Sequence, residues 1–137
     1  MAITKAGRTV LLVRDLDEAL DFYKDKLGFE IIFDGEIGDG YRALHVGPKT
    51  HRNVGIWLIK SESPEQQALI GRQTGGQPFM VFYTDDCRAT YEELKNKGVE
   101  FEGDPIEGEG DVTVFFKDLY GNRFVLVQLP NERYAPL

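Results

Sequence analysis

The sequence predicts an α+β fold in which one βαβββ module occurs twice in tandem. Both halves of the chain show the same order of strand-like and helix-like segments. Three residues of the first half recur in the second, each displaced by 70 positions and expected in the same role: Asp15 and Asp85, Gly28 and Gly98, Glu30 and Glu100. With 137 residues, 42% of them hydrophobic, the chain is long enough to bury the core of one compact domain.

The first module begins with an apolar, β-branched strand pattern over residues 9–13. Either Asp15 or Asp17 can cap the helix that follows. Its apolar residues recur at helical spacing and form one stripe: Leu16, Leu20, Tyr23 and Leu27. Gly28 is predicted to end this helix in the left-handed conformation. Three more strands are expected over residues 29–33, 41–46 and 54–60, with a Gly-Asp-Gly turn at residues 38–40.

The second module repeats this order. A strand is expected over residues 79–83, followed by a helix that Asp85 or Asp86 caps and Gly98 ends. The apolar stripe of that helix consists of Cys87, Tyr91 and Leu94. Further strands are predicted from residues 99–101, 112–116 and 123–128, with a turn at residues 110–111.

These boundaries predict a single domain over residues 1–137. Module one covers about residues 7–60, a linker covers residues 61–77, module two covers about residues 78–129, and residues 130–137 form a C-terminal tail. The linker contains Ser-Pro and Gly-Gly pairs, and its residues 65–70 could add a short helical turn.

Charge and cysteine content bear on partners and location. A net charge of -7 argues against a nucleic-acid partner, because binding to phosphates needs a basic face. No apolar run approaches the roughly 20 residues that span a bilayer, and the N-terminus lacks the apolar segment of a signal peptide. The single cysteine, Cys87, cannot form an intrachain disulfide and is expected to be a buried structural residue. We therefore expect a cytoplasmic protein without a nucleic-acid or membrane partner.

Two stretches of sequence resemble the vicinal oxygen chelate superfamily of glyoxalase I, bleomycin-resistance and extradiol-dioxygenase proteins. Residues 10–16, with Phe22-Tyr23 and residues 27–29, look like the opening of that fold. Residues 118–124 are similar to the family's Asp-Pro-Asp-Gly-Asn turn, from which Leu119 and Tyr120 depart. Over residues 7–129 the resemblance implies the glyoxalase/bleomycin-resistance/dioxygenase fold, in which two modules form a curved eight-stranded sheet around a cleft. It also implies a homodimer.

Metal-using members of this superfamily take four ligands from equivalent strand positions. Carried over one at a time, these positions are occupied here by Arg8, Trp57, Phe79 and Val125. None of these side chains is a metal ligand, because a divalent cation needs imidazole or carboxylate donors and arginine is a permanent cation. Shifting the alignment by one residue supplies no ligand either. The resemblance therefore implies a member that uses no metal and no other cofactor.

The same four residues suggest how the cleft could bind a small molecule instead. Arg8 would hold a carboxylate or phosphate through a forked hydrogen bond, Trp57 would stack on a ring, and Phe79 and Val125 would add an apolar wall. Four weaker candidates for the lining follow from strand position alone: His45, Tyr41, Tyr83 and Phe116. The sequence leaves open whether His45 faces the cleft. In the alternative interpretation, the apolar residues only fill the core and Arg8 pairs with an acidic residue.

Three functions remain open at this point. The first is a metal-free protein that binds a small aromatic or anionic molecule in its cleft. The second is an enzyme, a glyoxalase I-like lyase or a dioxygenase type, that uses a metal or metal-free site which the sequence does not reveal. The third is a structural or regulatory dimer whose cleft is filled by its own side chains. Fold resemblance alone does not choose among them.

Overall fold

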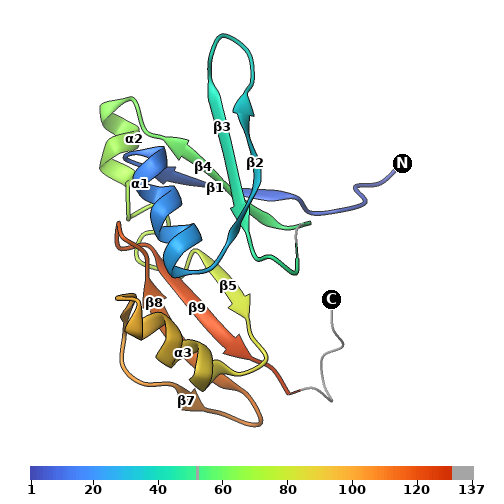
Figure 1. Ribbon diagram of the computed structural model, residues 1–137, viewed down its shortest axis with the longest axis vertical. Helices are drawn as coiled ribbons and strands as arrows, with labels where there is room; N and C mark the ends of the chain where they lie inside the picture. Colours follow the sequence, from blue (N-terminus) through green and yellow to red (C-terminus); the bar gives the residue numbers. More distant parts are fainter. Residues whose placement is uncertain (52, 131–137) are drawn as a thin grey trace. The chain divides into compact units, whose positions relative to one another are not determined.

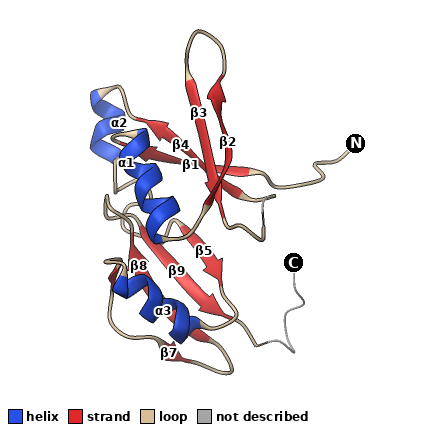
Figure 2. Ribbon diagram, viewed as in Figure 1, coloured by secondary structure: helices blue, strands red, loops and turns tan. Residues whose placement is uncertain are grey.

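The structure, a computed structural model, describes residues 1–51 and 53–130. The chain divides into two compact units, Met1–Gly71 and Arg72–Leu137. Each unit contains one β-sheet, with helices beside it in the first unit and one helix beside it in the described part of the second (Figures 1 and 2). The predicted linker lies across the boundary between these units, and residues 131–137 of the predicted tail lie outside the described residues.

The first unit has the predicted βαβββ order. Its elements are β1 (Arg8–Val13), α1 (Leu16–Leu20), the π-helix η1 (Asp21–Lys26), β2 (Glu30–Glu36), β3 (Arg42–Gly47), β4 (Gly55–Lys60) and α2 (Pro64–Leu69). The strands form a sheet in the order β1-β4-β3-β2. Strands β1 and β4 are parallel, whereas β3 runs antiparallel to both of its neighbours. Helix α2 forms within the predicted linker, close to the expected helical turn.

The second unit repeats this arrangement with one addition. Its elements are β5 (Met80–Tyr83), α3 (Cys87–Asn96), β6 (Glu100–Phe101), β7 (Ile106–Glu107), β8 (Val112–Lys117) and β9 (Arg123–Gln128). The sheet has the order β5-β9-β8-β6, and the two-residue strand β7 also pairs with β8. The predicted α+β fold of two βαβββ modules is therefore confirmed. The described residues form one four-stranded and one five-stranded sheet, and β7 was not predicted.

A π-helix accounts for the difference in length between the first helical segments of the two modules. Asp15 caps α1, because its Oδ1 accepts a hydrogen bond from the Glu18 backbone N–H at 2.8 Å. Of the two predicted caps of α3, Asp85 and Asp86, the structure shows Asp86, whose Oδ1 accepts from the Ala89 backbone N–H. Both helical segments nevertheless end before a glycine with positive φ, Gly28 or Gly98, so the first segment holds one residue more. The wider turn of η1 takes up that extra residue.

The alternation of side chains along the strands gives each sheet a buried face and an open face. In the first unit the buried face and the helices that cover it supply fully buried side chains, among them Leu11, Leu44, Ile56, Leu58, Ala19 and Tyr23. In the second unit α3 lies against one face of β8 and β9 (Figure 2). Its Cys87, Tyr91 and Leu94 are buried there with Val114, Phe116 and Phe124. The prediction that Cys87 is a buried structural residue is confirmed.

Strand β2 contains a β-bulge that changes which face its side chains occupy. Ile31 pairs with Val46 and Phe33 pairs with His45, so Ile32 is the additional residue on β2. Without the bulge, the side chains of Ile31 and Phe33 would lie on the same face. Because of the bulge, Ile31 lies with buried Val46 and Phe33 lies with half-buried His45. The bulge therefore delivers an aromatic ring to the open face.

Two glycines make room for this bulge. A β-carbon on Gly47 would lie 2.8 Å from Ile32 Cδ1, and a β-carbon on Gly55 would lie 2.5 Å from the same atom. Real β-carbons do not approach other heavy atoms so closely, so neither position accepts a larger residue without a local shift. Glycine at both positions therefore leaves the space that the Ile32 side chain occupies, which allows the bulge to form.

Among the described residues, no helix combines the length and apolar character that crossing a bilayer requires.

Candidate functional site

On the open face of the first sheet, three side chains each lie against a fourth, His45. The four are Arg8, Phe33, His45 and Trp57, which we call the open-face cluster. Arg8 Nε donates a hydrogen bond to His45 Nδ1 at 3.0 Å. The His45 ring lies 5.5 Å from the Trp57 ring and 5.6 Å from the Phe33 ring, measured between centroids. His45 therefore connects the cation at one end of the cluster to both aromatic rings.

Strand register explains why these residues meet. His45 on β3 pairs with Trp57 on β4 and with Phe33 on β2, so three adjacent strands place three rings in one row. Arg8 opens β1 and pairs with Gly55, two residues before Trp57. Gly55 has no side chain, and Ile32 Cδ1 from β2 lies close to where its β-carbon would be. The structure thus brings together Arg8, His45 and Trp57 from the predicted set and adds Phe33.

The Arg8 guanidinium is held by neutral groups. Nε donates to His45, and Nη1 donates to the carbonyl oxygens of Gly7 at 2.9 Å and Asn53 at 3.3 Å. Within residues 1–51 and 53–130 no carboxylate pairs with Arg8, and its Nη2 has no hydrogen-bond partner. The acidic partner that the alternative interpretation requires is therefore missing from the described residues. An exposed guanidinium with a free terminal nitrogen is suited to bind an anion.

His45 is held in its neutral form. Burial, and secondly the positive charge of Arg8, lower the pKa of the His45 imidazole below its ordinary value of 6.5. Since Nδ1 accepts the hydrogen bond from Arg8, the proton of the neutral ring resides on Nε2. His45 can therefore offer an N–H donor at Nε2 to a bound molecule while its other nitrogen orients Arg8.

This lowered pKa predicts a pH-dependent stability. The unfolded chain takes up a proton on His45 near pH 6.5, whereas the folded chain does so only at lower pH. The stabilisation is fully present above pH 6.5 and declines as the pH falls through the interval between the two pKa values. His45→Asn keeps an acceptor near Nδ1 but cannot titrate. Urea unfolding at pH 8 and pH 5 should therefore show that wild type loses more stability than His45→Asn, and an equal loss would contradict the assignment.

Trp57 is half-buried, and its indole nitrogen has an unusual environment. Nε1 is buried and lacks a hydrogen-bond partner among the described residues. Leaving a buried donor unpaired costs about 1–3 kcal/mol. A tryptophan that only filled a core would be expected to place this group against an acceptor or water.

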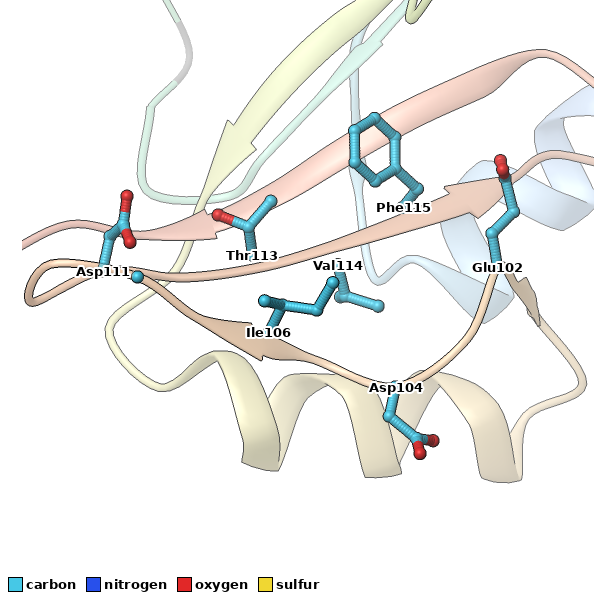
Figure 3. A pocket seen from close by; sticks show the side chains of 8 residues that line it. Glu102, Asp104, Ile106, Asp111, Thr113, Val114 and Phe115 are labelled. Carbon is cyan, nitrogen blue, oxygen red and sulfur yellow. The ribbon is translucent and has the colours of Figure 1, made fainter.

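Val125, which is buried at 9% exposure, and half-buried Phe115 lie on the face of the second sheet away from α3. Val125 pairs with Val81 on β5 and with Phe115 on β8. Figure 3 shows the Phe115 and Thr113 side chains projecting from the same side of β8. The Arg123 guanidinium lies 4.8 Å from the centre of the Phe115 ring. Phe115 thus occupies in the second unit the register position that His45 has in the first.

The other predicted residues of the second unit lie in different surroundings. Phe116 is 1% exposed and its ring contacts core phenylalanines, so it faces the helix and not the open side of the sheet. The residue of β8 on the open face is Phe115 and not the predicted Phe116, because neighbouring residues of a strand point to opposite faces. Phe79 directly precedes β5, and its ring contacts Phe124 at 5.9 Å. Tyr83 ends β5 and is 59% exposed.

Tyr41 lies apart from the open-face cluster. It belongs to the turn between β2 and β3, where its backbone N–H donates to the Gly38 carbonyl and its own carbonyl accepts from Ile37. His45 follows four residues later, about 13 Å along an extended strand. The predicted Gly-Asp-Gly turn is present, with positive φ at each of its three residues. Tyr41 is therefore not among the residues that we propose for ligand contact.

The residues at the family's four metal positions do not fit a metal ion. Arg8 is a cation, Trp57 and Val125 offer no lone pair, and Phe79 packs on another aromatic ring. The nearest imidazole, His45, already directs its Nδ1 lone pair at Arg8. Across the part of the chain that the structure describes, no group of three or more His, Cys, Asp or Glu residues could hold a metal ion. We therefore derive no chemical step through a metal.

A pocket of about 210 Å³ in the second unit contains three acidic side chains (Figure 3). These are Glu102, Asp104 and Asp111, which lie around Ile106 on β7 and Val114 on β8. Two of the carboxylates already have partners: Glu102 accepts from Arg123 at 2.8 Å, and Asp104 accepts from the Tyr91 hydroxyl at 3.1 Å. These two hydrogen bonds hold the segment between β6 and β7 to Arg123 on β9 and to Tyr91 on α3.

Comparison with known proteins agrees with this architecture. Residues 5–126 match the family model of the Glyoxalase/Bleomycin resistance protein/Dioxygenase superfamily. An uncharacterised protein of Shewanella frigidimarina is 36% identical over 124 residues, which are 90% of this chain and 92% of that protein. The crystal structure of UcmS2 is similar with a TM-score of 0.80 and 32% identity, covering 92% of this chain and 98% of that chain. TnmS3, described as an antibiotic binding protein from Streptomyces sp. CB03234, has a TM-score of 0.75 and 28% identity, covering 94% of this chain and 98% of its own. The chain therefore belongs to the glyoxalase/bleomycin resistance protein/dioxygenase superfamily.

Proposed function

We propose that this protein binds a small aromatic or amphipathic molecule with an anionic group at the open-face cluster, without a metal. The observation that carries the proposal is the Arg8 guanidinium, which His45 orients while Nη2 stays without a partner among the described residues. A carboxylate or phosphate at Nη2 would form a charge-assisted hydrogen bond. The rings of Trp57 and Phe33 on the same face would then contact the apolar part of the molecule.

Two further observations support a bound molecule. The buried, unpaired Nε1 of Trp57 would gain a partner if a ligand acceptor reached it. TnmS3, which shares the fold, is described as an antibiotic binding protein. We infer that this chain belongs to the same functional class and sequesters a small molecule.

Calorimetric titration with 2-naphthoate and with the neutral 2-naphthamide tests the proposal. Both molecules present the same ring system, so the difference between them isolates the anionic group. We expect naphthoate to bind more tightly to wild type, and we expect Arg8→Ala to weaken naphthoate binding by about 10- to 100-fold, the equivalent of losing one charge-assisted hydrogen bond. Naphthamide binding should change little.

Arg88→Ala is the matched control, because Arg88 is an exposed arginine on α3 in the second unit. It changes the net charge equally without touching the open-face cluster. Equal naphthoate affinities for wild type and Arg8→Ala, with both proteins folded, would refute the proposed role of Arg8.

Direct measurements can test the other two functions, an enzyme and a structural or regulatory dimer with a filled cleft. Elemental analysis of protein purified without a chelator should find far less than one metal ion per chain. A stoichiometric metal would favour the enzyme and contradict the proposal. The expected homodimer stays a prediction that light scattering on the eluting protein can test. A dimer that binds no member of a broad metabolite and antibiotic panel in a thermal-shift screen would favour the filled cleft.

A further inference from the structure

A second pocket in the first unit lies at the opposite end of the β1–β4 pair from Arg8. Its volume is about 460 Å³, and its lining consists of Arg14, Lys60, Ser61, Gln67 and Ile70. Arg8 pairs with Gly55 at one end of the two strands, and Val13 pairs with Lys60 at the other. Five residues of extended chain separate these ends by about 16 Å. The pocket is therefore distinct from the open-face cluster.

Parallel pairing explains why polar residues gather at this position. Because β1 and β4 run in the same direction, both end at the same edge of the sheet. Arg14 directly follows β1, and Lys60 and Ser61 stand at the end of β4. Helix α2 then brings Gln67 beside them. Four hydrogen-bond donors from three segments thus surround one cavity.

Ser61 is the most informative residue of the pocket. It is 3% exposed, and its backbone N–H donates to the Val13 carbonyl at 2.8 Å, which fixes its position. Its Oγ is buried and has no hydrogen-bond partner in the part of the chain that the structure describes. A buried hydroxyl is normally paired, so one left unpaired in the lining of a pocket indicates a missing partner.

The charges around the pocket indicate what that partner would be. Lys60 has no ion-pair partner among the described residues and lies exposed at the end of β4. Arg14 shares its charge with Glu18, to which Nη2 donates at 2.6 Å. A lysine ammonium, an arginine, a hydroxyl and an amide together offer donors that match the acceptor oxygens of an oxyanion.

We propose that this pocket binds a small oxyanion, a phosphate or carboxylate group, between Lys60 and Ser61. Lys60 supplies the unpaired positive charge, and the Ser61 hydroxyl donates a hydrogen bond to an oxygen of the anion. Gln67 provides a further donor at the rim. Ile70 closes the apolar side of the pocket. The proposal does not depend on ligand binding at the open-face cluster.

Titration of the full chain with inorganic phosphate, and separately with acetate, tests this assignment. Ionic strength is held constant with NaCl, because screening would otherwise change surface interactions. We expect saturable binding of at least one anion to wild type and about tenfold weaker binding to Lys60→Gln. Lys24→Gln, which removes an exposed lysine from η1 outside the pocket, should bind like wild type. Whether phosphate or acetate binds shows which kind of oxyanion the pocket prefers. If neither anion shows saturable binding, the proposal is overturned.

Two further variants distinguish anion binding at this pocket from anion binding elsewhere on the chain. Ser61→Ala removes an unpaired buried hydroxyl, so in NaCl alone its melting temperature should equal or exceed that of wild type. The same variant should lose most of the stabilisation that the anion gives to wild type. Arg8→Ala should keep anion binding at this pocket. Loss of binding in Arg8→Ala with retention in Lys60→Gln would place the anion at the open-face cluster and overturn the proposal.

Discussion

Gly55→Ala is expected to lower the free energy of unfolding by about 3 kcal/mol, the upper part of the range for overpacked sites. A β-carbon at this position would lie 2.5 Å from Ile32 Cδ1 and 2.6 Å from the Val46 carbonyl oxygen. The isoleucine could rotate away, but the carbonyl belongs to strand β3 and cannot move without disturbing its pairing with β4. Chemical denaturation followed by circular dichroism measures the difference.

Gly7→Ala provides the control. Gly7 lies one residue before β1, and a β-carbon there would meet no atom within 4 Å. This variant makes the same chemical change in the same unit, and its stability should stay within about 0.5 kcal/mol of wild type. If Gly55→Ala and Gly7→Ala have equal stabilities, the close packing between the bulge and β4 is not as described. If the alanine pushes the Ile32 bulge aside, the neighbouring Phe33 ring should move with it, and naphthoate binding should weaken.

Asp118→Ala should destabilise the protein by about 3 kcal/mol, because it removes three hydrogen bonds from a buried turn. Asp118 is 6% exposed and accepts from the backbone N–H groups of Tyr120 and Asn122 and from Asn122 Nδ2, each at 2.9 Å. Asn122 is itself 4% exposed, so loss of the carboxylate leaves buried donors unpaired. Thermal and urea unfolding of the variant measure the effect.

Asp25→Ala is the matched control for that variant, since Asp25 is an exposed aspartate on η1. Asp118→Asn should fall between Asp118→Ala and wild type, because the amide keeps one acceptor oxygen. The turn joins β8 to β9 and sets the register that pairs Phe115 with Val125. A small effect of Asp118→Ala would show that the strand pairing, and not the carboxylate, fixes this turn.

The repeated module could be predicted because its signals are local. A capping aspartate, an apolar stripe and a terminating glycine each act within a few residues, so they identify a helix without knowledge of the fold. The limit of such reasoning is visible at Asp85 and Asp86, which are equally good caps in the sequence. Only the structure distinguishes them, through the bond from the Ala89 N–H to Asp86. The two-residue strand β7 is too short for a pattern to indicate it.

The candidate site was less predictable because it depends on register between distant strands. Arg8, His45 and Trp57 were proposed from the sequence, but the bond between Arg8 and His45 requires β1 and β3 to be placed on either side of β4. Phe33 was missed because a bulge moves it to the other face, and bulges leave no periodic signal. The sequence does contain the information needed to choose Phe115 over Phe116 for the open face. Val112, Val114 and Phe116 alternate with Thr113 and Lys117, a pattern that already assigns Phe116 to the apolar face.

The π-helix of the first unit has a consequence for how the two modules could diverge after duplication. The additional residue of that segment is confined between a capping aspartate and a glycine with positive φ, Asp15 and Gly28. Strands on either side keep their positions, as the equivalent pairings Val10 with Trp57 and Val81 with Val125 demonstrate. An insertion or deletion in this helix is therefore absorbed locally. The helices can change length during evolution while the residues presented on the sheets are selected independently.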